Sequence, residues 1–427
     1  MKHILVFAYQ ISPYAGSEFA VAWNYVVNMS RTNRLTVLYG VSEGWTCIGN
    51  VDKMQKYLQA NRVENVEFVP VLPDEDIRRR IERIGNGRLA YYRFYSVYRR
   101  FHRLVAETAR QIIAREKIDL IHYLGPIGYR EPGYLRQLGL PYIWGPIGGI
   151  SSAPMRLLPG ASSFRGALEI VVKETVNVLQ YTFSRRIRKA LKETDLLLVN
   201  HTENASVVER IAGRRDLHIL PENGVDEFFP LNEDKFKSDK IECIWVGSLD
   251  ARKSLHTLLK ALTMVDKNAP LIVNIVGYGP LEEKHKRYAK AHGIDHFIKW
   301  HGRVDREEVF RIFNRSHLHI ITSLKEGHTT VIWEAMSMGV PTMTLSHCGM
   351  ADTVDDSCGI PIPVMSYGKV CREFAARLND IVRNPRQLQI LAKGVLESRK
   401  KYFWETRVEL WNKYYDMAIE IHNARKK

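Results

Sequence analysis

Two glutamates on either side of a glycine-containing loop are the residues of this 427-residue chain with the clearest chemistry. Glu326 lies in the segment Lys325-Glu326-Gly327-His328-Thr329-Thr330, and Glu334 follows eight residues after it. Carboxylates accept hydrogen bonds from hydroxyl groups, so Glu326 suits the hydroxyls of a sugar and Glu334 suits a vicinal diol such as that of ribose. We therefore predict a sugar-nucleotide site.

The elements around these acids are suited to position them. An apolar run at residues 317–321 predicts a buried strand that leads into the loop. Gly327 permits a tight turn, Thr329 or Thr330 can cap the helix that follows, and Gly339 ends it. Unpaired amides and the dipole at such a helix start favour a diphosphate. The alternative is a capped amphipathic helix with two solvated acids.

The length of the chain predicts two domains, because 427 residues exceed one ordinary core. Short apolar strands alternate with helical patterns such as Phe19–Met29 and Leu255–Leu262 in both halves, which favours parallel βαβ units. A turn-rich segment at Pro221–Asp226 separates the halves. The predicted strands are 3–8, 35–39, 66–71, 120–123, 142–144 and 196–200 in the first half, and 241–246, 271–276 and 317–321 in the second.

Glycine turns follow several of these strands. Gly277-Tyr278-Gly279-Pro280 lies between a predicted strand and a predicted helix, where the backbone can approach a ligand closely. The tetrapeptide Gly-Pro-Ile-Gly occurs at 125–128 and at 145–148; we attribute the match to chance and keep both loops as ligand candidates. His122, at the end of another strand, is a candidate catalytic residue from the first half, although a lone histidine there is more often structural.

The net charge of +15 is concentrated between residues 78 and 110, which hold ten arginines against Glu82 and Glu107. Aromatic residues alternate with these arginines, as in an interfacial helix on an anionic membrane. A core-packed helix with a solvated basic face fits equally well, and nucleic-acid binding is a third interpretation that lacks an accompanying motif. The aromatic residues are Tyr91, Tyr92, Phe94, Tyr95, Tyr98 and Phe101.

Other patterns limit the possible classes of protein. Five cysteines, an odd number without zinc-site spacing, favour a reducing cytoplasm. The apolar run at Ile4–Ala8 is too short for a signal peptide, and no apolar stretch is long enough to span a membrane. Asp74-Glu75-Asp76 could be a metal-binding acid pair, but we favour a solvated acidic turn and expect no metal cofactor.

With these residues identified, the chain resembles the retaining GT-B glycosyltransferases of family four over nearly its whole length. The matching motifs are Gly16-Ser17-Glu18, Asn223-Gly224-Val225-Asp226, Lys253, Gly277-x-Gly279-Pro280, His301-Gly302-Arg303-Val304 and the two-glutamate segment. The resemblance implies an α/β fold with two Rossmann-like domains facing across a cleft. The expected parts are an acceptor-binding domain at 1–220, a nucleotide-sugar-binding domain at 221–402 and a helix at 403–427 that crosses back to the first domain.

The resemblance also implies roles for individual residues. Glu326 would contact the donor sugar and Lys253 would neutralise the diphosphate, with Glu334 on the ribose. Where the family often has an arginine after the strand-end glycine, this chain has Ser248, which puts a two-cation phosphate clamp in doubt unless Arg252 compensates. The further donor-binding candidates are Gly16, Gly277, Gly279, Arg303, Val304, Gly327, His328, Thr329 and Thr330.

The resulting hypothesis is a hexosyltransferase that moves a sugar, with retention, from a nucleotide-sugar donor, a UDP-sugar, to a saccharide or lipid-linked saccharide in cell-surface polysaccharide synthesis. The enzyme would work in the cytoplasm, peripherally on the inner face of the membrane, with an anionic membrane surface as a further partner and no nucleic acid. The alternatives are a nucleotide-sugar epimerase and a basic membrane- or nucleic-acid-binding module with a vestigial site.

Overall fold

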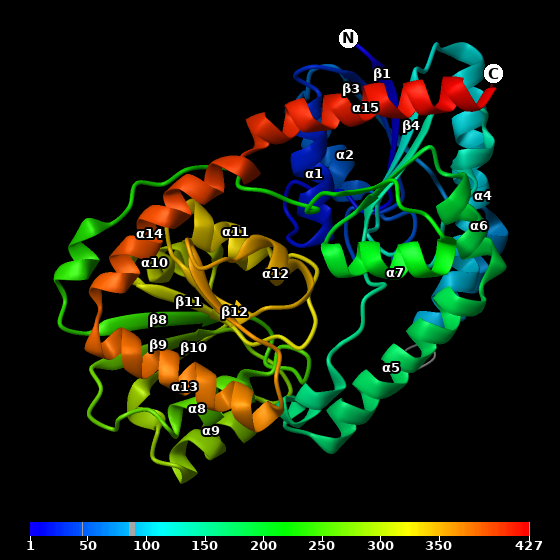
Figure 1. The fold of residues 1–427 in the computed structure, drawn as a ribbon. Helices are drawn as coiled ribbons and strands as arrows, with labels where there is room; N and C mark the ends of the chain where they lie inside the picture. The colour runs from blue at the N-terminus through cyan, green and yellow to red at the C-terminus, as the bar shows by residue number, and fades with distance from the viewer. Residues whose placement is uncertain (45, 85–89, 427) are drawn as a thin grey trace. The chain divides into compact units, whose positions relative to one another are not determined.

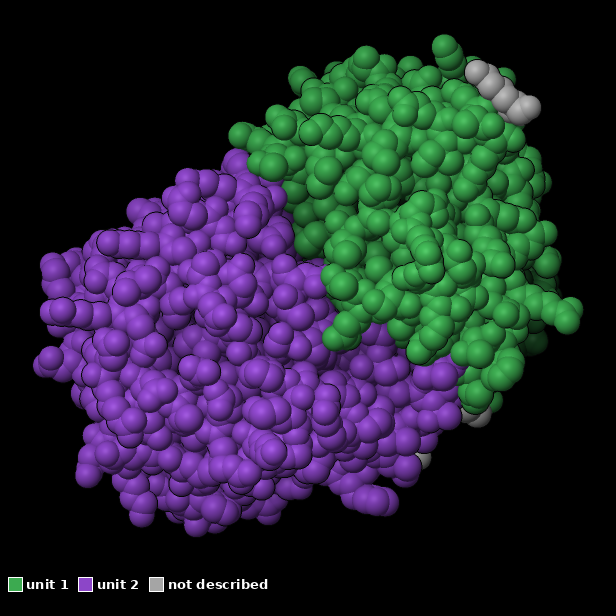
Figure 2. Space-filling model, viewed as in Figure 1, with its two compact units in different colours: residues 1–150, 179–223, 404–427 green, residues 151–178, 224–403 purple. Residues whose placement is uncertain are grey.

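The computed structural model describes residues 1–44, 46–84 and 90–426. They divide into two compact units, which Figure 2 draws in different colours. Unit 1 comprises residues 1–150, 179–223 and 404–427, and unit 2 comprises residues 151–178 and 224–403. Each unit is built on one parallel sheet, so the predicted α/β organisation is confirmed (Figure 1).

Unit 1 contains a seven-stranded parallel sheet with the strand order β3-β2-β1-β4-β5-β6-β7. Its strands are β1 (His3–Ala8), β2 (Arg34–Tyr39), β3 (Val66–Pro70), β4 (Leu120–Gly125), β5 (Tyr142–Ile147), β6 (Leu196–Val199) and β7 (Leu217–Ile219). Its α-helices are α1 (Glu18–Met29), α2 (Asp52–Ala60), α3 (Glu75–Glu82), α4 (Ala90–Arg115), α6 (Arg185–Glu193), α7 (Thr202–Ala212) and α15 (Trp404–Lys426). A short 3₁₀ helix lies at Leu135–Gln137.

Unit 2 contains a six-stranded parallel sheet with the order β10-β9-β8-β11-β12-β13. The strands are β8 (Ile241–Val246), β9 (Leu271–Val276), β10 (Ile298–Gly302), β11 (Leu318–Ile321), β12 (Thr342–Leu345) and β13 (Gly359–Ile362). The α-helices are α8 (Leu255–Leu262), α9 (Glu282–Ala291), α10 (Arg306–Arg315), α11 (Thr330–Ser337), α12 (Cys348–Thr353), α13 (Tyr367–Arg383) and α14 (Arg386–Ser398). Short 3₁₀ helices lie at Met155–Ala161, Glu233–Lys237, Asp295–Phe297 and Arg399–Tyr402. Helix α5 (Phe164–Phe183) begins in unit 2 and ends in unit 1.

The strands are apolar because helices cover both faces of each sheet. In β1 every residue is buried, with Leu5 and Phe7 in one core cluster and Ile4 and Val6 in another. This alternation is what a parallel sheet buried on both faces requires.

The division of the chain between the units differs in one place from the predicted domains. The divisions after residues 223 and 403 lie close to the predicted ones after 220 and 402, but residues 151–178 belong to unit 2. Leu157 and Ala161 pack into the core of unit 2, and the Ser254 hydroxyl donates a hydrogen bond to the Gly160 carbonyl at 2.9 Å. This packing holds the segment on unit 2, although it lies before the predicted boundary.

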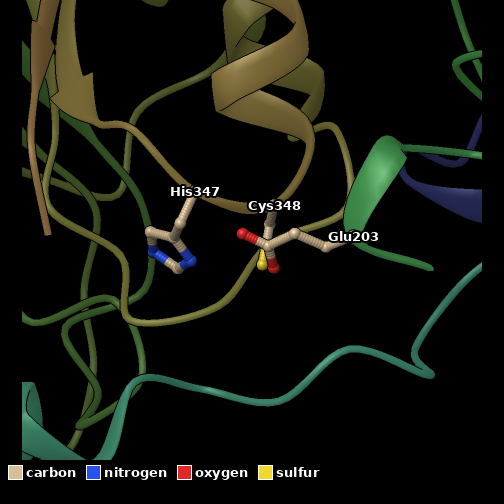
Figure 3. A group of neighbouring side chains, drawn as sticks. All are labelled: Glu203, His347 and Cys348. Atoms are coloured by element: carbon tan, nitrogen blue, oxygen red, sulfur yellow. The ribbon is translucent and has the colours of Figure 1, made fainter. Parts of the chain in front are cut away.

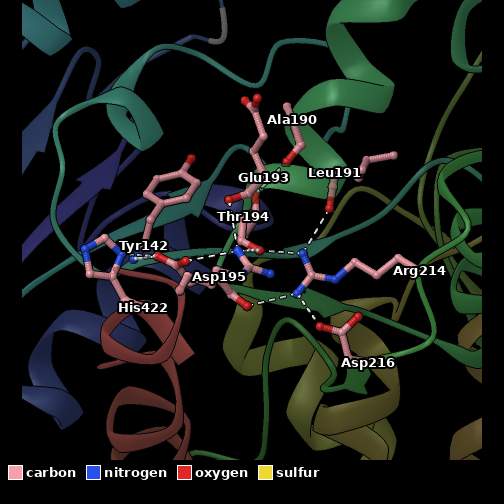
Figure 4. A network of polar contacts seen from close by, with 10 residues as sticks. Tyr142, Ala190, Leu191, Glu193, Thr194, Asp195, Arg214, Asp216 and His422 are labelled. Atoms are coloured by element: carbon pink, nitrogen blue, oxygen red, sulfur yellow. Dashed lines mark hydrogen bonds and ion pairs between the residues drawn. The ribbon is translucent and has the colours of Figure 1, made fainter. Parts of the chain in front are cut away.

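The last helix, α15, is part of the core of unit 1. Trp411 and Tyr415 are buried in the same cluster as β1. At its far end the Asp195 carboxylate binds His422 at 2.9 Å and Arg425 at 3.1 Å, and it accepts the Tyr142 amide at 3.0 Å (Figure 4). Two kinds of contact therefore hold α15 on unit 1: the apolar packing of Trp411 and Tyr415, and the polar contacts of His422 and Arg425 with Asp195.

Of the basic segment between residues 78 and 110, Arg78, Arg79 and Arg80 lie on α3, and residues 90–110 lie on α4. Phe94, Tyr98 and Phe101 are buried in the core of unit 1, while Arg93 and Arg103 face solvent. Of the two structural interpretations of this segment, the core-packed helix with a solvated basic face is therefore the one that the described residues support. Residues 85–89 of the segment lie outside the described part of the chain, as do the side chains of Tyr91 and Tyr92.

None of the described helices combines the length and the apolar composition that crossing a bilayer requires.

Candidate active site

The predicted sugar-nucleotide residues of the second half lie on α11 and on the loops at the carboxyl end of the unit 2 sheet. Strands β9, β8 and β11 are neighbours, so the loops that follow them meet at one edge, where open α/β sheets bind ligands. The Leu324 amide donates to the Arg252 carbonyl at 2.8 Å, and the Thr322 hydroxyl donates to the Lys253 carbonyl at 3.0 Å. These bonds fix the loop after β8 against the loop after β11.

Gly277 and Gly279 pack directly against the backbone of the loop after β8. Gly277 has a φ of +134°, and a Cβ there would lie 1.8 Å from the Gly247 carbonyl oxygen. A Cβ on Gly279 would lie 2.7 Å from the Leu249 carbonyl oxygen. The Gly-x-Gly turn thus lies against the loop after β8, and the approach of its backbone to a ligand stays a prediction.

The Glu326 carboxylate is held by two cations. Its Oε1 lies 2.7 Å from Lys253 Nζ and 2.5 Å from an Arg252 guanidinium nitrogen. Burial on its own would raise the pKa of Glu326, but Lys253 and Arg252 outweigh it and hold that pKa below its usual value. Glu326 is therefore a carboxylate at neutral pH, able to accept hydrogen bonds.

Ser248 stands where an arginine was expected, yet the structure still brings two cations together. The Asp250 amide donates to the Ser248 carbonyl at 2.8 Å, and the Lys253 amide donates to the Asp250 carboxylate at 2.9 Å. This turn directs Arg252 and Lys253 to the same oxygen of Glu326. Arg252 thus lies where it can compensate for the missing arginine.

The start of α11 lies beside the same cation. Thr329 is the residue before the helix, and its hydroxyl makes no capping bond to the helix amides. Instead, Thr329 Oγ1 lies 3.5 Å from Lys253 Nζ. Thr329 is therefore the N-cap residue, one of the two predicted positions, but its hydroxyl faces the ammonium and does not bond the helix amides.

Buried contacts hold the rest of the glycine loop. A Cβ on Gly349 would lie 2.2 Å from the Gly327 carbonyl oxygen, so the start of α12 packs directly on the loop. His328 is buried and stacks on Trp333, with 5.7 Å between the ring centroids. Thr330 is the first residue of α11.

Glu334, on α11, lies in a less charged environment than Glu326. The nearest cation to its carboxylate is Arg306, at 3.9 Å, and its side chain is 15% exposed. Burial raises the pKa of Glu334, with Arg306 opposing the shift. At the neighbouring strand end the Arg303 guanidinium stacks over Tyr278 at 5.4 Å, and Val304 packs against an apolar cluster of unit 2.

Two residues of this site were missed in the sequence. Arg306 faces Glu334, and Lys325 forms an ion pair with the buried Glu174 of α5 at 2.9 Å. Glu174 and Lys325 are 151 residues apart in the chain, so no local spacing signalled the pair. Arg306 stands three residues after Arg303, and only its place at the start of α10 could have indicated it.

His122 is enclosed within unit 1, which favours the structural interpretation of this residue, and its catalytic role stays a prediction. The side chain is fully buried in unit 1. Nδ1 lies 2.9 Å from the Tyr25 hydroxyl, and Nε2 lies 2.9 Å from the Gly145 carbonyl oxygen. Burial lowers the pKa of His122 to about 4, so the ring is neutral and joins β4 to its neighbours.

The glycine loops of unit 1 lie at the carboxyl edge of its own sheet. Gly128 and Gly148 form a parallel bridge, and the Gly148 amide donates to the Ile127 carbonyl at 2.8 Å, so the two Gly-Pro-Ile-Gly segments run side by side. Gly16 has open space around the position of a Cβ, and the next residue, Ser17, has a positive φ of 58°. Gly16 belongs to unit 1, whereas the other donor-binding candidates belong to unit 2.

Asp74 and Asp76 have structural partners. Asp74 caps α3 by accepting the Ile77 amide at 2.8 Å, and Asp76 pairs with Arg80 at 2.9 Å and Arg100 at 3.0 Å. These contacts correspond to the acidic turn that the sequence favoured.

Removal of this cap gives a first prediction. Asp74→Ala should lower the free energy of unfolding by about 1 kcal/mol, since one helix amide loses its acceptor. Enzymatic turnover below the melting temperature should be unchanged. Denaturant unfolding and activity assays measure the two effects, and a loss of turnover in a folded variant that added manganese restores would show that Asp74 is a metal ligand.

His347 and Cys348 open α12 in unit 2 (Figure 3). His347 Nε2 lies 3.2 Å from the Ser323 carbonyl oxygen, and Cys348 Sγ lies 3.8 Å from the Ser151 hydroxyl. Glu203, drawn with them, belongs to unit 1. Within either unit taken by itself, the described residues contain no group of three side chains placed to share a metal ion.

The two parallel sheets and the site on unit 2 can now be compared with known proteins. Residues 229–394 match the family model described as Glycosyl transferases group 1. The matched residues all lie in unit 2.

Individual relatives are distant. The putative colanic acid biosynthesis glycosyltransferase WcaL of Escherichia coli K12 is 23% identical over 226 residues, which cover 51% of this chain and 54% of WcaL. The chain thus matches about half the length of that curated relative.

The structure of Anabaena HepE in complex with UDP and glucose matches 97% of this chain and 99% of its own, with a TM-score of 0.59 and 14% identity. The lipopolysaccharide outer core galactosyltransferase WaaB, in its apo form, has the same coverage and identity and a TM-score of 0.62. These likenesses show that the chain has the GT-B fold.

Proposed function

We propose that this protein is a retaining glycosyltransferase that moves a hexosyl group from a nucleotide sugar, a UDP-sugar, to a saccharide or lipid-linked saccharide acceptor in cell-surface polysaccharide synthesis. The reaction is proposed to take place in the cytoplasm. One observation carries the proposal. Lys253, Arg252, Glu326 and the start of α11 converge at the carboxyl edge of one parallel sheet.

The charges at this place fit a diphosphate attached to a sugar. Two cations against one carboxylate leave one excess positive charge, and the amino end of α11 adds a favourable potential for an anion. Glu326, kept ionised by the same cations, is suited to accept sugar hydroxyls next to the phosphates. Glu334, on the second turn of α11, is suited to the ribose diol.

In the proposed reaction the bond between the anomeric carbon and the diphosphate oxygen breaks, and a bond to the acceptor oxygen forms on the same face. The leaving diphosphate takes the acceptor proton. Lys253 and Arg252 stabilise the negative charge that develops on that leaving group, which is where electrostatic catalysis contributes most.

The comparisons support this choice of substrates by analogy. HepE is described in complex with UDP and glucose, WcaL is named for colanic acid biosynthesis, and WaaB is named for the lipopolysaccharide outer core. The HepE description thus names a uridine nucleotide and a sugar, and the WcaL and WaaB descriptions name glycosyl and galactosyl transfer.

A screen of nucleotide sugars tests the proposal directly. A ligand at about a hundred times its dissociation constant stabilises the folded state by about 2.7 kcal/mol, so the true donor should raise the melting temperature measurably. Sugar transfer to a saccharide acceptor should then require that donor. Donor turnover without any acceptor would indicate an epimerase, and the absence of both stabilisation and turnover would indicate a binding module with a vestigial site.

Chelation gives a further prediction. EDTA should leave the transfer rate largely intact, because Lys253, Arg252 and the α11 start are proposed to offset the phosphate charge. The initial rate with and without EDTA measures this. Complete loss of transfer, with recovery on adding manganese or magnesium, would contradict metal-independent catalysis.

A further inference from the structure

The outer face of α5 exposes the largest group of apolar side chains on any single described element. Of the fifteen large hydrophobic side chains that are exposed in the described residues, six lie on this helix. Phe164 is 87% exposed and Phe183 is 71% exposed. The others are Leu168, Val172, Val178 and Leu179.

These side chains form one stripe. At about 100° per residue, Phe164, Leu168, Val172, Leu179 and Phe183 fall within about 100° of one another along roughly 29 Å of helix. Thr175 and Thr182 lie between them on this face, and the first charged residue, Arg165, lies at its edge. A continuous apolar face of this length on a folded protein marks a surface that another body covers.

Basic residues flank the stripe at both ends. Between residues 155 and 193 there are eight lysines and arginines against three glutamates, which gives +5. Arg156 before the helix, and Arg185 and Lys192 after it, are exposed, with no carboxylate of the described residues within ion-pair distance. An apolar helical face between cations is the pattern of a helix lying in the interface of an anionic bilayer.

The charge also decides against a second copy of the chain as the occupant. Each copy carries +15, and pairing two α5 stripes would bring the basic flanks of both copies together. An anionic lipid surface complements both the apolar stripe and its flanks.

We propose that α5 docks the protein on an anionic lipid bilayer through the stripe formed by Phe164, Leu168, Val172, Leu179 and Phe183. The opposite face of the helix contacts the candidate active site. Glu174 on that face is buried and binds Lys325, the residue before Glu326, at 2.9 and 3.0 Å from its two oxygens. A docked α5 would therefore hold the loop of Glu326 near the lipid surface.

The experiment is sedimentation of the full chain with vesicles of phosphatidylcholine, with and without phosphatidylglycerol, in the absence of any donor sugar. We expect binding to the acidic vesicles that weakens as salt rises. A variant with Phe164→Gln, Leu168→Gln, Leu179→Gln and Phe183→Gln should bind at least about tenfold more weakly, because the apolar contact is removed. Glutamine keeps the helix propensity of this exposed face.

A matched control carries the same four changes at exposed apolar positions elsewhere, Leu72→Gln, Ile219→Gln, Met264→Gln and Ile390→Gln. It should bind like the wild type.

Should the stripe variant fail to fold, as judged by circular dichroism, Leu168→Trp provides an independent test. It enlarges the apolar face and should bind the acidic vesicles severalfold more tightly.

Three results would overturn the proposal. The first is equal vesicle binding by the stripe variant and the wild type. The second is that the double variant Arg93→Gln/Arg103→Gln loses vesicle binding while the stripe variant keeps it in full. That result would show that α4 is the docking helix. The third is a wild-type dimer that the stripe changes convert to a monomer, without vesicle binding by either. Because vesicle binding is measured without sugar transfer, failure here is distinguishable from failure of the proposed enzymatic function.

Discussion

Glu326→Gln is expected to lower kcat by about a hundredfold or more while leaving the affinity for a nucleoside diphosphate unchanged or raised. Glutamine keeps the size of the side chain and loses the charge that accepts sugar hydroxyls. Lys253 and Arg252 lose their counter-charge at the same time, so both become more available to phosphate. Steady-state kinetics and calorimetric titration with UDP measure the two effects separately.

The matched control for this variant is Glu283→Gln, a change of the same kind on an exposed helix of the same unit. Its turnover should equal that of the wild type. Near-normal turnover by a folded Glu326→Gln protein would remove Glu326 from the catalytic machinery. A large loss of diphosphate affinity would contradict the arrangement in which the carboxylate competes with phosphate for the cations.

Lys253→Ala is expected to weaken nucleoside diphosphate binding by about tenfold to a hundredfold. A hydrogen bond to a charged group contributes about 1.5–3 kcal/mol, and each 1.4 kcal/mol changes an equilibrium constant tenfold. Arg252→Ala should have a smaller and more salt-sensitive effect, because the Arg252 side chain is 42% exposed and that of Lys253 is 12% exposed. Titration with UDP at two salt concentrations measures both.

Lys299→Ala, on the exposed face of β10, serves as the charge-matched control and should leave affinity unchanged. If Lys253→Ala also left affinity unchanged, the phosphate role would pass to Arg252. If neither cation mattered, the diphosphate would have to bind elsewhere.

The sequence was sufficient to predict the parallel sheets and the loop of the two glutamates. Buried parallel strands are short apolar runs, and β1, β8 and β9 have the predicted bounds because turns and charged residues limit them on both sides. The site loop was recognisable because its glycine, its acids and the helix after it are consecutive in the chain.

Features that depend on distant contacts were not predictable in this way. The pattern around His122 indicated a strand end, but its partners Tyr25 and Tyr415 lie 97 and 293 residues away and are what bury it. The aromatic residues of α4 are at helical spacing, which suits a core and a membrane surface equally, and only the packed structure shows that Phe94 and Phe101 face the core. Residues 151–178 were assigned to the wrong half for the same reason.

The position of α15 constrains the order in which the protein can form during its synthesis. The core around β1 includes Trp404, Trp411 and Tyr415, so unit 1 is incomplete until these residues have left the ribosome. Both segments of unit 2 are translated before them. Proteins commonly fold from the amino end. Here the nascent chain instead keeps apolar surface beside β1 uncovered until Trp404, Trp411 and Tyr415 have left the ribosome.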